Sequence, residues 1–299
     1  MTSCASRTTS VGPTSFVRID GLLAAGTTRS FEFFPPKTDV ESSVLGATLR
    51  DLEQLDPTFV SVTYRGGRES RQRTFDLVTQ IQRAGRITAM AHLICVGHSR
   101  SEVRDILKNY SDAGVVNVMA LGGDIPDDPG LATSEFAHAI DLVELAREVG
   151  EFSIGVAAHP QGHPRSSDLG RDRDHLARKL TRADFAVTQF FFEAREWTRL
   201  VEDLGGRGVT KPVLPGIMPV TTLGGVARMA TMGAVVPTVL VDRLDRANAR
   251  GGAPAVRAEG IKAATELCTE LLDANAPGLH FYTLNRSTAT REIHAALFP

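Results

Sequence analysis

Several polar side chains interrupt apolar segments of the chain, and one of them has the character of a catalytic acid. Glu32 stands between Phe31 and Phe33. A carboxyl group among aromatic rings is costly to ionise, so we expect burial to raise the pKa of Glu32 and to keep it able to donate a proton. The alternative is that Glu32 faces outward and pairs with a helix Lys or Arg, because side-chain alternation along a strand does not choose between the two faces.

Two further positions carry residue types that bind ligands. Asp124 follows Gly122 and Gly123, which allow a backbone to approach a ligand closely. An ordinary turn aspartate is the alternative. Gln189 precedes three phenylalanines, and a buried amide must find hydrogen-bond partners. A ligand contact and an internal hydrogen bond of the fold both meet that requirement.

Three histidines raise the question of a metal site. His92, His159 and His163 could bind a metal ion together with Asp124, as in a metal-dependent hydrolase. However, prolines follow both His159 and His163, and they break the helical geometry in which two histidines four residues apart bind zinc. We therefore expect no metal.

The elements that must position these residues begin with short apolar segments. These are continuous apolar runs rather than alternating ones, which is typical of strands buried on both faces of a parallel sheet. The predicted strands cover Arg29–Phe34, Thr58–Tyr64, Ile87–Cys95, Val115–Gly122, Phe152–His159, Phe185–Phe191, Val213–Met218 and Leu279–Leu284.

Segments of helical periodicity separate the predicted strands. Ser99 and Glu102 form a capping box that marks one helix start. The predicted helices cover Val40–Leu55, Ser99–Ala113, Ser134–Val149, Asp174–Arg182, Trp197–Leu204, Leu223–Met232 and Val256–Ala274. This alternation predicts an α/β fold of the (β/α)₈ barrel type, the TIM barrel, in a single domain. A doubly wound Rossmann sheet is the alternative, but no G-x-G-x-x-G pattern follows the first strand.

In such a barrel the chemistry takes place at the carboxyl ends of the strands. By position alone, this rule selects a set of polar residues. They are Glu32, Thr63, Tyr64, His92, Asp124, His159, His163, Gln189, Tyr282, Asn285 and Arg286.

The composition indicates a globular protein of ordinary charge. The chain has 299 residues, of which 42 % are hydrophobic and 23 % charged, with a net charge of −2. This balance offers no field for nucleic-acid binding, and no segment approaches the ~20 apolar residues of a membrane span. Three cysteines without a CxxC pattern exclude a disulfide framework, so we expect a reduced, cytoplasmic protein. We expect residues 1–20 to form a disordered leader without a secretion signal and residues 21–299 to form the barrel.

Seven short sequence blocks between residues 28 and 290 occur in the same order as in a known protein family. They are Ser30–Lys37, Phe59–Tyr64, Ala91–Leu93, Gly123–Asp124, Thr188–Phe192, Pro215–Val220 and His280–Arg286. Together they resemble the methylenetetrahydrofolate reductases of the bacterial type. The resemblance implies a (β/α)₈ barrel that reduces 5,10-methylenetetrahydrofolate to 5-methyltetrahydrofolate.

The resemblance also implies roles for individual residues. Glu32 matches the general acid that protonates N10 of the folate. Asp124 matches the aspartate that contacts the pterin and stabilises the developing cation, and Gln189 matches the amide that binds the pterin edge. Tyr282 and Arg286, in the last block, are carried over as substrate-binding residues.

No side chain donates a hydride, so a redox partner is required. Members of the family use a nicotinamide to reduce a bound FAD, which then reduces the folate. The positions that match flavin contacts are Thr63, His92, His163, Asp172 and Lys179.

The chain departs from the family pattern at three positions. Gly122 stands where an arginine contacts the flavin, His159 replaces a tyrosine beside it, and Leu223 replaces an aromatic residue. Losing a charge-assisted contact weakens flavin binding by ~1.5–3 kcal/mol. We therefore expect Gly122 and His159 to lie in a cofactor site that takes NADH or NADPH, with direct hydride transfer and no bound FAD, as in some actinobacterial members.

Two other functions remain as alternatives. The first is an FAD-relayed reductase of the ping-pong type. The second is a non-catalytic folate-binding relative, which would have little reason to keep Glu32.

Overall fold

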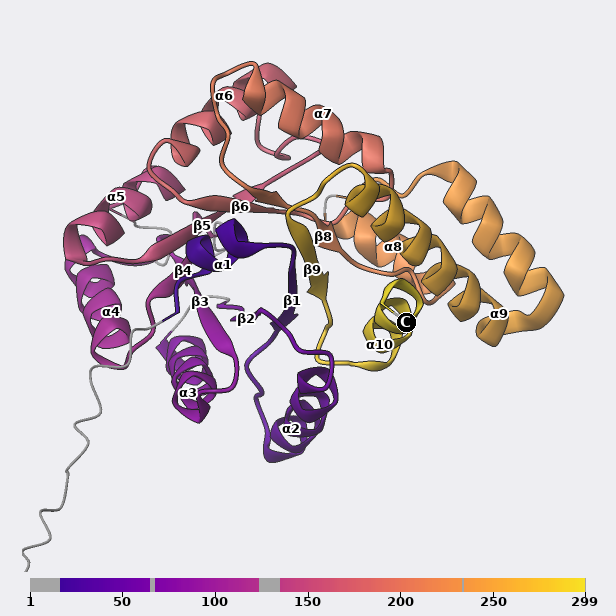
Figure 1. Ribbon diagram of the computed structural model, residues 1–299, viewed down its shortest axis with the longest axis horizontal. Helices are drawn as coiled ribbons and strands as arrows, with labels where there is room; N and C mark the ends of the chain where they lie inside the picture. The colour runs from indigo at the N-terminus through magenta and orange to yellow at the C-terminus, as the bar shows by residue number, and fades with distance from the viewer. Residues whose placement is uncertain (1–16, 65–67, 124–134, 233, 299) are drawn as a thin grey trace, which may run out of the picture.

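The computed structural model describes residues 17–64, 68–123, 135–232 and 234–298. Over these residues the chain forms the predicted (β/α)₈ barrel, a ring of parallel strands surrounded by helices (Figure 1). The strands are β1 (Thr28–Phe33), β2 (Phe59–Val62), β3 (Thr88–Ile94), β4 (Asn117–Leu121), β5 (Ser153–Ala158), β6 (Phe185–Thr188), β7 (Val213–Leu214), β8 (Gly216–Ile217) and β9 (Gly278–Tyr282).

The barrel closes through one segment that is interrupted by a proline. β7 and β8 are the two halves of the strand predicted over Val213–Met218, and Pro215 between them has no N–H to donate. Its carbonyl accepts a hydrogen bond from the backbone N–H of His280 at 3.0 Å. β7 pairs with β6 and β8 pairs with β9, so this segment joins the two ends of the sheet order β7-β6-β5-β4-β3-β2-β1-β9-β8.

The helices alternate with the strands, as predicted. α4 begins with the predicted capping box, in which the Ser99 hydroxyl accepts from the Glu102 N–H and the Glu102 carboxylate accepts from the Ser99 N–H. The helices are α1 (Ile19–Ala25), α2 (Asp39–Glu53), α3 (Arg68–Ala84), α4 (Arg100–Asp112), α5 (Ala139–Val149), α6 (Leu169–Leu180), α7 (Ala194–Gly205), α8 (Leu223–Thr231), α9 (Thr238–Asp273) and α10 (Thr288–Leu297).

Several helices differ from the prediction. α1, α3 and α10 were not predicted, and α5 starts later than predicted because His138 takes the N-cap position. α9 includes an additional first half that buries Leu244 and Ala247, three residues apart on one face. Its two halves meet at Gly251 and Gly252, whose backbone is not helical.

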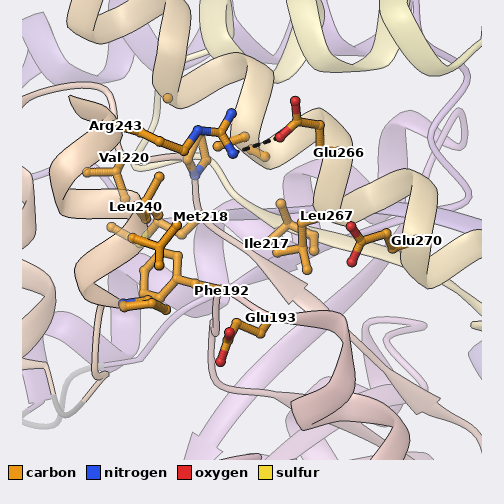
Figure 2. Close-up of a pocket in the computed structure, with 16 residues that line it drawn as sticks. Phe192, Glu193, Ile217, Met218, Val220, Leu240, Arg243, Glu266, Leu267 and Glu270 are labelled. Carbon is orange, nitrogen blue, oxygen red and sulfur yellow. Dashed lines mark hydrogen bonds and ion pairs between the residues drawn. The ribbon is translucent and has the colours of Figure 1, made fainter. Parts of the chain in front are cut away.

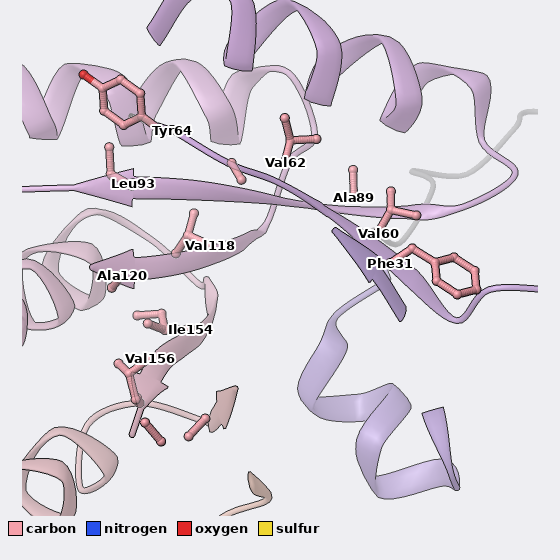
Figure 3. Packing of buried hydrophobic residues seen from close by; sticks show 14 of the residues in the cluster. Phe31, Val60, Val62, Tyr64, Ala89, Leu93, Val118, Ala120, Ile154 and Val156 are labelled. Atoms are coloured by element: carbon pink, nitrogen blue, oxygen red, sulfur yellow. The ribbon is translucent and has the colours of Figure 1, made fainter. Parts of the chain in front are cut away.

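Apolar side chains pack on both sides of the strands. Residues such as Phe31, Val60 and Val62 face the helices and form the larger core (Figure 3). The inside of the barrel is filled by a smaller cluster from α1 and the strands. It consists of Ile19, Leu23, Phe59, Met90, Met119, Phe185, Val187 and Leu214.

α1 closes the amino-terminal end of the barrel. The Ile19 N–H donates to Asn117 Oδ1 at 2.9 Å, and Asn117 Nδ2 donates to the Val17 carbonyl at 3.0 Å. Ile19 and Asp20 belong to α1 although we expected a disordered leader over residues 1–20, and residues 1–16 of that leader lie outside the described residues.

A glycine in α9 sets how closely this helix approaches the barrel. A Cβ atom on Gly260 would lie 1.8 Å from the carbonyl oxygen of Val220, which is backbone and cannot move aside cheaply. We expect Gly260→Ala to lower the free energy of unfolding by about 3 kcal/mol, measured by urea denaturation. Gly224→Ala in α8 is the control, because a Cβ there has no atom within 4 Å. An equal loss in both variants would contradict the prediction.

Candidate active site

Polar side chains cover the inner wall of the barrel near the carboxyl ends of β1, β2, β3 and β9. Phe31 and Phe33 are buried among the helices, so Glu32 between them points into the barrel. The strand register pairs Glu32 with Ser61 on β2. The outward alternative for Glu32 is therefore wrong.

The Glu32 carboxylate lies between two imidazoles. Its Oε2 atom is 3.3 Å from His92 Nε2 and 3.5 Å from His280 Nε2, and it accepts a hydrogen bond from the Ser61 hydroxyl at 3.4 Å. The Glu32 side chain is 11 % exposed. All three groups approach the same oxygen, so they hold the carboxyl in one orientation from one side.

The pKa of Glu32 is lowered to about 2, contrary to the expectation from the sequence. Burial is the largest influence and raises this pKa, but charged His92 and His280 together outweigh it through their Coulomb attraction and their hydrogen bonds. The expectation was wrong because it considered only the phenylalanines next to Glu32 in the sequence. The imidazoles come from strands distant in the sequence.

Glu32 should therefore stabilise the fold at moderate pH and lose this effect in acid. Its folded pKa lies below the ordinary 4.5, so the stabilisation is complete above pH 4.5 and is lost as the pH falls towards 2. We expect the free energy of unfolding of the wild type to fall by about 3 kcal/mol more than that of Glu32→Gln across this interval. Urea denaturation of both proteins at several pH values measures the difference, and parallel curves would contradict the assignment.

His280 connects Glu32 to a hydroxyl group further down the barrel. Its Nδ1 lies 2.8 Å from the hydroxyl of Ser30, and that hydroxyl is also 3.3 Å from the Leu279 carbonyl. Ser30, His280 and Glu32 thus form a hydrogen-bonded chain across β1 and β9. The sequence patterns did not single out Ser30, Ser61 or His280 as site residues. A signal was present, because Ser30 precedes Glu32 by two residues and must share its face of the strand.

Tyr282 lies on the same inner wall as Glu32, and Gln189 directly follows β6; each uses its side-chain oxygen within the fold. The Tyr282 hydroxyl donates to the Thr188 carbonyl at 2.7 Å, and burial raises its pKa well above the usual value. Its ring meets the His280 ring edge-on at 5.4 Å. Gln189 Oε1 accepts from the Phe190 N–H at 3.0 Å. Tyr282 therefore belongs to the wall around Glu32, while the hydrogen bond of the Gln189 side chain stays within its own segment.

The predicted cofactor residues after β5 form a second group. The rings of His159 and His163 meet edge-on at 4.6 Å. Burial, reinforced by the positive charges of His163 and Lys179, lowers the pKa of His159 to about 3, so this ring is neutral at physiological pH. Burial also lowers the pKa of Lys179 to about 8, against the opposing effect of Asp172, and its ammonium donates to the Ala157 carbonyl at 2.8 Å.

Thr63 and Gly122, two of the predicted cofactor positions, have a polar atom or space that the described residues leave unused. Thr63 Oγ1 is buried and has no hydrogen-bond partner within the described part of the chain, whereas His92 Nε2 faces the Glu32 carboxylate at 3.3 Å. Among the described residues, no atom lies within 4 Å of a Cβ atom placed on Gly122. Buried polar atoms are normally paired, so Thr63 fits a ligand at this end of the barrel. Asp124 lies outside the described residues, and Arg286 is exposed beyond β9.

A cavity of about 150 Å³ lies between β8 and α9, apart from this inner wall (Figure 2). Its lining includes Met218, Leu240 and Leu267, and Arg243 at its edge forms an ion pair with Glu266 at 2.8 Å. None of the groups around Glu32 lines it, so we do not assign it to the chemistry.

The described residues contain neither a candidate metal site nor a candidate membrane-spanning helix. No group of three or more His, Cys, Asp or Glu side chains within this part of the chain could hold a metal ion. None of the helices within the same residues has the length and apolar character to cross a membrane.

Related structures share this architecture. A protein from Clostridium thermocellum that binds two copies of 5-methyl-5,6,7,8-tetrahydrofolic acid has a TM-score of 0.63 at 11 % identity, over 93 % of this chain and 97 % of that chain. A Yersinia pestis DHPS with a pterine-sulfa conjugate has a TM-score of 0.51 at 11 % identity, over 92 % of both chains. At these identities the similarity shows the fold alone.

Sequence comparisons are more specific. The chain is 35 % identical over 264 residues to the 5,10-methylenetetrahydrofolate reductase of Pectobacterium carotovorum subsp. carotovorum, and 34 % identical over 260 residues to that of Escherichia coli (strain K12), with 86 % of each chain covered in both cases. The family described as methylenetetrahydrofolate reductase matches residues 18–297. The match spans the whole barrel, and the chain therefore belongs to the methylenetetrahydrofolate reductase family.

Proposed function

We propose that this protein reduces 5,10-methylenetetrahydrofolate to 5-methyltetrahydrofolate with a hydride taken directly from NADH or NADPH. Membership of the family supports the reduction of methylenetetrahydrofolate. The observation that carries the proposal is the buried Glu32 carboxyl, which two imidazoles hold on the inner wall of the barrel.

In this proposal Glu32 passes a proton to N10 of the folate. The bond between N10 and the bridging carbon then breaks, its electron pair stays on N10, and an iminium forms between N5 and that carbon. A hydride from the nicotinamide adds to the same carbon and completes the methyl group, leaving the oxidised nicotinamide.

The lowered pKa of Glu32 means that its carboxyl group is ionised before the reaction begins. Because the carboxyl is ionised, a proton must reach it before the transfer to N10, and the two imidazoles beside Oε2 are the neighbouring groups that can pass one. Ser61 and both imidazoles use Oε2, so we assign Oε1 to the contact with N10. The carboxyl then relays a proton rather than holding one at rest.

The remaining substrate residues keep the roles that the resemblance implies. We assign Asp124 to the developing cation, Gln189 to the pterin edge, and Tyr282 and Arg286 to the rest of the folate. The Tyr282 hydroxyl is already bonded to the Thr188 carbonyl, so we assign the substrate contact to its ring.

Two features support direct transfer from a nicotinamide. Gly122 offers no cation to a flavin, and no atom of the described residues fills the space where its side chain would be. His159 presents a neutral imidazole at the end of β5, beside His163. We assign the reductant to the residues around these two positions. They are Thr63, His92, Gly122, His159, His163, Asp172 and Lys179.

An FAD-relayed reaction is the second candidate, since reductases of this family normally use a flavin with a pyridine nucleotide. The unpaired Oγ1 of Thr63 and the ammonium of Lys179 favour it, because both remain where the resemblance places flavin contacts. Bound there, FAD would accept a hydride from the nicotinamide and transfer it to the folate.

Isotope transfer separates these candidates. The purified protein is assayed with NADH deuterated at the transferred position, in ordinary water, with and without added FAD. Direct transfer places one deuterium in the new methyl group without FAD, as measured by mass spectrometry. A requirement for FAD, or loss of the label to water, identifies the relay. Tight folate binding without any product under either condition identifies a non-catalytic relative.

A further inference from the structure

Arg173 is a buried arginine on α6 that has no role in the proposed reaction. Its side chain is 2 % exposed. Burying a guanidinium is costly unless each of its donors finds a partner, so such a residue normally has a specific task. α6 and α7 lie next to each other outside the barrel, on the side of β5 and β6 (Figure 1).

The guanidinium of Arg173 contacts the first two residues after β5. Nη1 donates to the His159 carbonyl at 2.9 Å, and Nη2 donates to the Pro160 carbonyl at 2.6 Å. Nη1 also lies 3.1 Å from Asp172 Oδ2, and Nε lies 3.2 Å from Asp203 Oδ2 on α7. One planar group thus binds two successive carbonyls and two carboxylates, which a lysine ammonium cannot reproduce.

These contacts fix the loop that carries the two histidine rings. The His159 carbonyl also accepts the Gly162 N–H at 2.9 Å, which closes a turn between the rings of His159 and His163. Arg173 therefore holds this turn from the side of the helices. The same guanidinium orients Asp172, another residue that we assign to the reductant site.

We propose that Arg173 is a positioning residue for the reductant. By binding the carbonyls of His159 and Pro160, Arg173 fixes the positions of the rings of His159 and His163 and of Asp172. In this proposal NADH or NADPH binds beside these three residues. This inference rests on the proposed function, because the reductant is a nicotinamide only there.

Arg207 provides a matched control. It also joins α6 to α7, through Asp174 Oδ1 at 2.7 Å and the Asp203 carbonyl at 2.9 Å. Its third contact is with the Gly170 carbonyl, so Arg207 bonds to neither His159 nor Pro160. Arg207→Met removes a tie between the same two helices and leaves the turn intact.

The test compares Arg173→Met, Arg173→Lys and Arg207→Met by steady-state kinetics. We expect Arg173→Met to raise the KM for NADH by about tenfold or more, a loss of about 1.4 kcal/mol, with the KM for methylenetetrahydrofolate within about twofold of the wild type. Arg173→Lys should recover only part of the loss, and Arg207→Met should change neither KM. A cleft of about 550 Å³ borders Arg173, so millimolar guanidinium should restore NADH binding to Arg173→Ala.

The outcomes separate this inference from the proposed function. If both methionine variants change the KM for NADH equally, or if the folate KM changes as much, Arg173 only ties the helices and the inference is overturned. If the wild type reduces no folate with NADH, the proposed function fails, and NADH binding measured by its fluorescence decides the role of Arg173. Weaker binding in Arg173→Lys than in Arg207→Met then supports the role, whereas equal binding, or no binding to the wild type, overturns it. Arg173→Lys also serves if Arg173→Met does not fold.

Discussion

Glu32→Gln should lower the turnover of methylenetetrahydrofolate by about 1,000-fold while folate binding stays measurable. The amide keeps the size of the side chain but cannot relay a proton from His92 or His280 to N10. Steady-state kinetics and equilibrium binding of the folate measure the two effects separately. Binding of NADH should stay close to that of the wild type, because nothing in the proposal gives Glu32 a contact with the nicotinamide.

Glu292→Gln is the matched control for this experiment. Glu292 also has a lowered pKa, caused first by its hydrogen bond with Arg257, but this pair lies on the surface between α9 and α10. We expect its turnover to equal that of the wild type. Turnover of Glu32→Gln near the wild-type value would leave Glu32 with a structural role only.

Gly122→Arg should increase the affinity of the protein for FAD by about tenfold to a hundredfold. The resemblance places a flavin-binding arginine at this position, and the described residues place no atom within 4 Å of a Cβ atom on Gly122. A guanidinium there can form a charge-assisted contact with the flavin. Titration of FAD, followed by its absorbance and fluorescence, measures the affinity of both proteins.

Two results would contradict this role of position 122 in flavin binding. One is a wild-type protein that purifies with a full complement of FAD. The other is a Gly122→Arg variant that folds normally and binds FAD no more tightly. Gly224→Arg on α8 is the control for a general effect of added positive charge, since that position also has open space.

Most strands were predictable from the sequence because they are largely continuous apolar runs, although β1 (Thr28–Phe33) also carries polar residues such as Arg29 and Glu32. The run Val213–Met218 was located correctly, although the split at Pro215 depends on which neighbours pair with each half. The first half of α9 was missed because its apolar positions stand among many charged ones, and the glycine pair at 251–252 resembled a loop.

The site was harder to predict because its properties depend on tertiary neighbours. Glu32 and His92 were selected because they lie near the carboxyl ends of predicted strands. In the structure, Glu32 Oε2 and His92 Nε2 are 3.3 Å apart. The direction of the Glu32 pKa did not follow, since His280 comes from a strand about 250 positions later in the chain. Local sequence shows the cost of burying a charge but not which charges will compensate for it.

The pairing of β1 with β9 has a consequence for synthesis on the ribosome. The proposed proton donor is assembled from the first and last strands of the ring, so a growing chain holds the Glu32 carboxylate long before the His280 imidazole has been translated. We therefore expect catalytic activity to appear only when β9 pairs with β1. This late step joins two strands from nearly opposite ends of the chain.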